Sequence, residues 1–290
     1  MNLGPEYADQ NLCYIGVETL PPEGKMAAKK PKEDKAKKPK KSAKSGPKAI
    51  SSEFGFRAYL DKSKDLGTSL LLVIPLFVVY QIGVLATGGV RNGVDFLSDA
   101  MWLISDGQTL NYLGINVVIL LAFIGLTLYL RRKGHFSPGV FPYVLAESAI
   151  YAMFLGTAIL QTMSWLGMGK LLAAGSGAEY GLIASIVLSL GAGVYEETVF
   201  RLIGMGGLFT LGTKAFNMPA WMSAVFAVIL SSLVFSGIHY IGSLGDAFTL
   251  GSFMFRFFAG VILAVIFYLR GFAVAVYTHA IYDIIVMVFR

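Results

Sequence analysis

Near its middle the chain reads GVYEETVFR (residues 193–201), which places two carboxylates and one guanidinium inside an otherwise apolar, membrane-like run. Each charged residue at the centre of a bilayer costs about 3 kcal/mol, so three unpaired charges would cost roughly 9 kcal/mol. Glu197 and Arg201 are four residues apart with the acid first, which predicts an ion pair on one helix face. Glu196 projects about 100° away from that face. Glu196 is therefore the carboxylate that needs a functional explanation.

The composition is that of a membrane protein. Of the 290 residues, 55% are hydrophobic and only 14% are charged, whereas a water-soluble chain carries about 25% charged residues. The net charge of +6 comes from one block, because residues 25–48 contain eleven lysines. Such a block is typical of a solvated tail, and it has no interleaved aromatic residue for stacking on bases, so we expect no nucleic-acid partner. The single Cys13 excludes an intrachain disulfide and a Cys-based zinc site.

Hydropathy divides the chain into a polar tail and a membrane domain. Residues 1–50 are rich in Lys, Pro, Ala and Ser, and we expect them to be disordered. Met26 is an alternative start of the protein. Residues 51–65 are compatible with a short interfacial helix, and residues 66–290 are expected to form an all-α bundle with its functional core at about 181–290. The predicted transmembrane spans, about seven in number, are 66–86, 112–130, 144–166, 181–211, 220–241, 248–269 and 272–289.

The distribution of Lys and Arg predicts the orientation, because cytoplasmic loops carry an excess of positive charge. The lysine tail, residues 131–133, Lys214 and Arg270 should lie on the cytoplasmic side, and the acidic loop 88–111 should lie outside. We therefore expect a multi-pass protein of the plasma (inner) membrane with a cytoplasmic N-terminus.

Eight ionisable residues lie within the predicted spans. Phe235 precedes His239 by four residues, and His279 precedes Asp283 by four, so each pair shares one helix face. Three helices thus present a polar face, and we expect these faces to converge because lipid excludes them. Glu147 and Arg256 match no such pattern, and we interpret them as interfacial or packing residues. The full set is Glu147, Glu196, Glu197, Arg201, His239, Arg256, His279 and Asp283.

A buried carboxylate that faces two histidines is suited to activating water. Burial favours the neutral carboxyl and so makes the carboxylate a more effective general base near neutral pH. The same three residues, Glu196, His239 and His279, are possible ligands of a divalent metal such as Zn²⁺, because two His and one Glu form a known catalytic zinc set. Here the ligands would come from three helices, and the His-Glu-x-x-His spacing is absent.

The depth of these residues poses a question about the fourth and fifth spans. At about 1.5 Å per residue, Glu196 and His279 fall toward the cytoplasmic side and His239 falls nearer the outer side. Either the fifth span starts outside the bilayer or the fourth span is broken. The fourth span is also long enough to need a break or a steep tilt, and Gly204, Gly206 and Gly207 mark the expected break.

Three motifs in order, each in an apolar span, carry a resemblance. Glu-Glu-x-x-x-Arg, Phe-x-x-x-His and His-x-x-x-Asp, within residues 190–285, resemble the CPBP family. That family holds the type II CAAX prenyl endopeptidases and bacteriocin-processing intramembrane proteases. The resemblance implies an all-helical membrane bundle and an intramembrane endopeptidase, with members described both as metalloproteases and as metal-free glutamate proteases.

The resemblance also implies roles for the six motif residues. Glu196 would activate water that His239 holds, and His279 would stabilise the oxyanion. Glu197 and Arg201 complete the first motif, and we interpret them as a structural pair. Asp283 stands where the prenyl-protease branch has Asn, although the wider family admits Asp. Because an ionised Asp cannot donate a hydrogen bond, we expect it to orient His279 or to remain protonated.

The leading hypothesis has two alternatives. One is a non-proteolytic scaffold or immunity factor with the same fold, which would not need the complete motif set. The other is a proton-coupled carrier, which would favour inverted repeats, and we find no internal repeat. The expected partners are the lipid bilayer and a peptide or membrane-protein substrate. A prenylated C-terminus, a leader peptide and a membrane-protein segment are all compatible with the sequence.

The predicted orientation can be tested by accessibility labelling. Cysteines introduced at Ser42 and at Ser98, in a background that lacks Cys13, should react from opposite sides of the membrane. An impermeant maleimide applied outside intact cells should label position 98 and spare position 42, because the positive charge favours a cytoplasmic tail. Labelling of position 42 from outside would refute the orientation.

Overall fold

A computed structural model describes residues 56–90, 103–106, 108–133, 138–172, 180–241 and 245–289. The predicted tail, residues 1–50, and most of the predicted outer loop lie outside these ranges. Every regular element in the described part is a helix. In chain order they are α2 (Phe56–Lys64), α3 (Leu66–Ala86), α5 (Thr109–Lys133), η2 (Pro138–Val140), α6 (Phe141–Trp165), η3 (Gly169–Leu172), α7 (Leu182–Gly191), η4 (Ala192–Met205), α8 (Gly206–Lys214), α9 (Ala220–Ile238), α10 (Leu250–Arg270) and α11 (Phe272–Val288).

The predicted polytopic helical bundle is confirmed. Among the described residues, five helical segments are long and apolar enough to cross a membrane, and two shorter apolar helices, Leu113–Tyr129 and Phe272–Val288, complete the set expected from hydropathy. Large apolar side chains such as Ile82, Met153 and Phe154 are exposed on the protein surface. Exposed apolar surface of this kind suits contact with lipid. The predicted interfacial segment is represented by α2, which immediately precedes α3.

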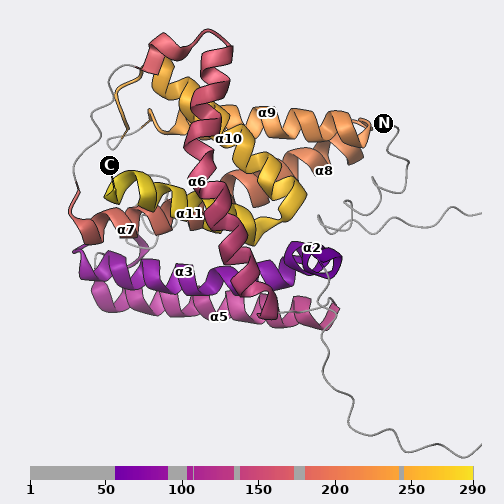
Figure 1. Cartoon of the computed structure of the whole chain (residues 1–290). Coiled ribbons are helices and arrows are strands. Elements are labelled where there is room, and N and C mark those ends of the chain that lie inside the picture. Colours follow the sequence, from indigo (N-terminus) through magenta and orange to yellow (C-terminus); the bar gives the residue numbers. More distant parts are fainter. Residues whose placement is uncertain are drawn as a thin grey trace, which may run out of the picture. The chain divides into compact units, whose positions relative to one another are not determined.

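Helix α11 lies at the centre of the bundle. It packs against α3, α6, α7, η4 and α10, and every residue from Phe272 to Ala280 is buried. In Figure 1, α3 and α5 run side by side, as do α8 and α9. The link from α10 to α11 is one residue, Gly271, with φ = 91°, a conformation that glycine adopts without steric cost. His279 therefore lies on the most enclosed helix.

The fourth span is continuous rather than broken. The segment Leu182–Lys214 is 33 residues long, and Gly206 keeps right-handed helical angles of φ = −62° and ψ = −42°. The break that we expected at Gly204–Gly207 is therefore wrong. Instead the winding changes, because η4 is a π-helix that returns to α-helix at Gly206. π-Helical segments within α-helices are rare and are frequent at functional sites, and this one contains the charged motif.

Two helices approach each other closely at the start of η4. A Cβ atom on Gly193 would lie 2.7 Å from both the Ala280 side chain and the Val276 carbonyl of α11. On the preceding turn, a Cβ on Gly191 would lie 2.4 Å from the ring of Tyr80 on α3. Small residues at such positions let helix backbones approach within a membrane. Gly193 thus brings the charged motif against the helix that carries His279.

A second polar cluster fixes α2 to the bundle. Arg270 donates from Nη2 to Glu147 Oε2 at 2.9 Å, Tyr151 donates to Glu147 Oε1 at 2.7 Å, and Tyr59 of α2 also donates to Glu147. Burial, and then the hydrogen bond to Glu147, raises the pKa of Tyr59 above its usual range, so the phenol stays a donor. Glu147, interpreted from sequence as an interfacial or packing residue, is half-buried and joins α2, α6 and α10.

Replacing Gly193 by alanine should destabilise the bundle, because the new methyl group would overlap α11. We expect a loss of about 1–3 kcal/mol, the usual cost of overpacking, measured by thermal unfolding in detergent. Gly125→Ala in α5 is the matched control, since its Cβ would meet no atom within 4 Å. Equal unfolding temperatures for the two variants would contradict the close contact between η4 and α11.

Candidate active site

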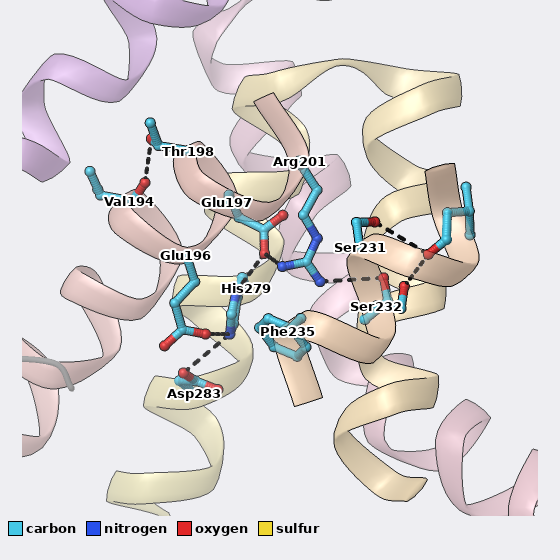
Figure 2. Close-up of polar contacts among 12 residues, drawn as sticks. Val194, Glu196, Glu197, Thr198, Arg201, Ser231, Ser232, Phe235, His279 and Asp283 are labelled. Carbon is cyan, nitrogen blue, oxygen red and sulfur yellow. Dashed lines mark hydrogen bonds and ion pairs between the residues drawn. The ribbon is translucent and has the colours of Figure 1, made fainter. Parts of the chain in front are cut away.

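The charged residues of three helices meet around the π-helix. Figure 2 shows Glu196, Glu197 and Arg201 from η4 beside His279 and Asp283 from α11. Glu196, Glu197, Arg201 and His279 are all buried, with at most 6% of the surface of each residue exposed. Successive residues on an α-helix diverge by about 100°, yet both glutamates of η4 are buried. The site is therefore an enclosed group of acids and bases between η4, α9 and α11.

Glu197 and Arg201 form the ion pair that their spacing predicts. Arg201 Nη1 lies 2.9 Å from Glu197 Oε1, and the two side chains are 1% and 0% exposed. Arg201 also donates from Nη2 to the carbonyl oxygen of Gly260 at 3.3 Å, and its guanidinium lies 4.3 Å from the ring centroid of Phe235. The guanidinium thus joins η4, α9 and α10. A buried charge without such partners would be strongly destabilising.

Glu197 has a second contact that the sequence did not reveal. Its Oε1 lies 2.7 Å from Nδ1 of His279, and because a carboxylate only accepts, the ring nitrogen donates. The other ring nitrogen, Nε2, lies 3.5 Å from Asp283 Oδ2 and 3.8 Å from Glu196 Oε2. The sequence predicted that Asp283 orients His279 or remains protonated; its carboxylate lies near Nε2 of His279, and Glu197 makes the short contact to Nδ1. Carboxylate oxygens therefore lie near both ring nitrogens of His279, with the short contact at Nδ1.

His239 reaches the same carboxylate from α9. It follows the last helical residue of α9, Ile238, and its Nδ1 donates to the carbonyl oxygen of Phe235 at 2.8 Å. That bond directs Nε2 to within 3.8 Å of Glu196 Oε2. The sequence placed His239 nearer the outer side than Glu196, but the two side chains lie side by side. A break in the fourth span does not explain this proximity, because that span is continuous. His239 and Asp283 are the more exposed members, with side chains 21% and 25% exposed.

The described residues contain no group of three or more His, Cys, Asp or Glu arranged to hold a metal ion. Glu196, His239 and His279, the possible ligands from the sequence, are nevertheless neighbours through Glu196 Oε2. Separations of 3.8 Å exceed a direct hydrogen bond and are of the kind that a bridging water spans.

Sequence reasoning missed the environment of Arg256 on α10. Its Nη1 donates to the hydroxyl of Tyr240 at 2.9 Å, and its Nη2 donates to Asp246. The Tyr240 hydroxyl is also 2.6 Å from that of Ser252. The signal was present in the sequence as a cation inside an apolar span, but its partners lie in the loop between α9 and α10, whose course hydropathy does not predict.

Removing the charge of Glu197 should destabilise the protein more than removing that of Glu196. Glu197→Gln leaves the buried Arg201 uncompensated, which typically costs about 3–5 kcal/mol, and should lower the unfolding temperature in detergent. Glu196→Gln, the isosteric change on the neighbouring residue, should have a smaller effect because Glu196 lies 3.8 Å from two histidines, whereas Glu197 lies 2.9 Å from the buried Arg201. Adding Arg201→Met to Glu197→Gln should recover part of the loss. Two equally stable single variants would show that the ion pair contributes little.

Comparison with known families assigns the part of the chain that carries this geometry. Residues 178–285 match the sequence model of the type II CAAX prenyl endopeptidase Rce1-like family. The matched range includes α7, η4, α8, α9 and α10 and nearly all of α11, and with them all six motif residues. Searches of curated proteins and of solved structures found no match. Residues 178–285 therefore match the Rce1-like type II CAAX prenyl endopeptidase family, within a chain whose helices are long and apolar enough to cross a membrane.

Proposed function

We propose that the protein is an intramembrane endopeptidase in which Glu196 activates the attacking water. The observation that carries the proposal is the position of Glu196 Oε2, 3.8 Å from Nε2 of both His239 and His279. Three helices bring one carboxylate and two imidazoles to a common point, and the carboxylate is 3% exposed. A family of endopeptidases matches this part of the chain, and acid–base groups at this spacing support hydrolysis of a peptide bond.

The first step is attack by water. His239 donates from Nδ1 to the Phe235 carbonyl, so in its neutral form Nε2 is an acceptor. A water between Glu196 and His239 would donate one hydrogen to each and direct an oxygen lone pair at the substrate carbonyl. As the carbon–oxygen bond forms, Glu196 takes the proton, in the role of general base.

The second requirement is stabilisation of the oxyanion. His279 has carboxylate oxygens near both ring nitrogens, and its imidazolium form would donate from Nε2 to the developing negative charge. Prearranged donors of this kind contribute strongly in water-poor sites. Glu197 holds the ring through Nδ1, and Arg201 holds Glu197. Asp283 stabilises the imidazolium electrostatically, a role that does not require it to donate a hydrogen bond.

The reaction then ends with proton return. Glu196, now protonated, gives its proton to the leaving nitrogen as the carbon–nitrogen bond breaks, and the products are a carboxylic acid and an amine. The family name points to prenylated protein C-termini as the first substrates to test, with leader peptides and membrane-protein segments as alternatives. We also propose a plasma-membrane location with a cytoplasmic N-terminus, from the distribution of lysine and arginine.

Glu196→Gln should abolish peptide cleavage while leaving the protein folded. A general base typically contributes a factor of about 10²–10⁴ in rate, so turnover should fall by at least about 10²-fold. The assay incubates purified protein in detergent or liposomes with a peptide library, including prenylated peptides, and detects products by mass spectrometry. His239→Ala should cause a similar loss, and unchanged thermal unfolding would establish that both variants are folded.

Asp283→Asn provides a matched comparison for Glu196→Gln, because both exchange a carboxylate for an amide in the same site. We expect the Asp283 variant to retain more activity, since its carboxylate acts on His279 rather than on water. Treatment with a chelator, followed by addition of Zn²⁺, addresses the metal-dependent alternative; activity that is lost and then restored would oppose a metal-free mechanism. No cleavage of any peptide by the wild-type protein would favour the scaffold hypothesis instead.

A further inference from the structure

Helix α10 carries a cation, Arg256, whose partners lie in the segment that joins α9 to α10. The guanidinium of Arg256 donates to the Tyr240 hydroxyl and to the Asp246 carboxylate, and it lies 5.2 Å from the ring centroid of Tyr240. The Arg256 side chain is 25% exposed and that of Asp246 is 59% exposed. Arg256 therefore combines a firmly held position with access from outside the protein.

Three connections place Arg256 beside the candidate catalytic residues. Tyr240 follows His239 directly in the chain. The backbone N–H of Asp246 donates to the carbonyl oxygen of His239 at 2.8 Å. Along α10, Arg256 is one turn before Gly260, whose carbonyl accepts from Arg201. Arg256 is thus tied, through Tyr240 and Asp246, to the segment that carries His239, one of the two partly exposed residues of the site.

The contact with Asp246 is the exchangeable part of this arrangement. Tyr240 accepts from Nη1 of Arg256, whereas Asp246 accepts from Nη2, so the guanidinium keeps one anchor when Asp246 leaves. The Asp246 side chain is 59% exposed, so a second carboxylate can reach the guanidinium and take its place. A guanidinium with fixed orientation is the preferred protein group for binding a carboxylate through paired hydrogen bonds.

We propose that Arg256 binds the C-terminal carboxylate of the substrate peptide and that Asp246 occupies this position when substrate is absent. The proposal rests on the proposed endopeptidase function, and it makes Arg256 a specificity-determining residue. Protein C-termini are the substrates to which the family name already points, and Arg256 would be the residue that recognises their free carboxylate. Asp246 would then reduce binding of peptides that lack a carboxylate to replace it.

The test compares two forms of one cleavable peptide, with a free C-terminal carboxylate or with a C-terminal amide. The wild-type protein should cleave the carboxylate form with a KM lower by about tenfold or more, the effect expected of a charge-assisted hydrogen bond. Arg256→Gln should remove the difference between the two forms, and Arg256→Lys should leave an intermediate difference because it keeps the charge but not the paired donors. Asp246→Asn should lower the KM for the carboxylate form.

A purely structural role of Arg256 would raise the KM, or lower kcat, equally for both peptides, and that result would overturn the proposal. A wild-type protein that does not distinguish the carboxylate from the amide form would also overturn it.

Binding of the fluorescently labelled peptides to the Glu196→Gln protein separates the role of Arg256 from the endopeptidase function. Carboxylate-dependent binding that Arg256→Gln removes, without cleavage by the wild type, would refute the endopeptidase function alone. Cleavage together with equal binding of both peptides would refute only the role of Arg256.

Discussion

The contact on which the site depends is the shared oxygen of Glu197. Its Oε1 is 2.9 Å from the Arg201 guanidinium and 2.7 Å from Nδ1 of His279, so one atom joins the π-helix to the central helix α11. A carboxylate without these partners would be very costly in this environment, and so would the guanidinium without the carboxylate. The position of His279 is therefore determined by the same interaction that makes the buried charges of η4 tolerable.

This interaction requires the close approach of η4 and α11. Gly193 allows the approach because even a methyl group would overlap the α11 backbone. The widened winding of η4 accompanies the burial of both glutamates, Glu197 toward Arg201 and His279, and Glu196 toward the Nε2 atoms of the two histidines. The two adjacent carboxylates thus have different surroundings, because Glu197 pairs with Arg201 and Glu196 faces the two imidazoles. This difference follows from backbone geometry, since the two side chains are chemically identical.

How far the sequence predicted these features depended on the range of each interaction. The Glu197–Arg201 pair could be predicted because it is local and follows helical spacing, and the apolar spans could be predicted because lipid imposes their length and composition. The Nδ1 partner of His279 could not be predicted, since Glu197 and Asp283 are both carboxylates and only packing decides which one the ring nitrogen meets.

The π-winding of η4 was also missed, and glycines that indicated a break lie in a continuous helix. Arg256 was interpreted as a packing residue because its partners Tyr240 and Asp246 are brought to it by a loop with no periodic pattern.

The two arginines of α10 have a consequence for the surrounding lipid. Arg256 and Arg270 are each tied to an acid on another element, Asp246 and Glu147, and they are 14 positions apart in the sequence, or about 21 Å along a helix. The hydrocarbon core of a typical bilayer is about 30 Å thick. Sliding of α10 along its axis would separate Arg270 from Glu147 on α6, so we expect the bilayer to adapt to this helix by local thinning. We therefore expect membrane thickness to influence the helix whose Gly260 carbonyl accepts a hydrogen bond from Arg201.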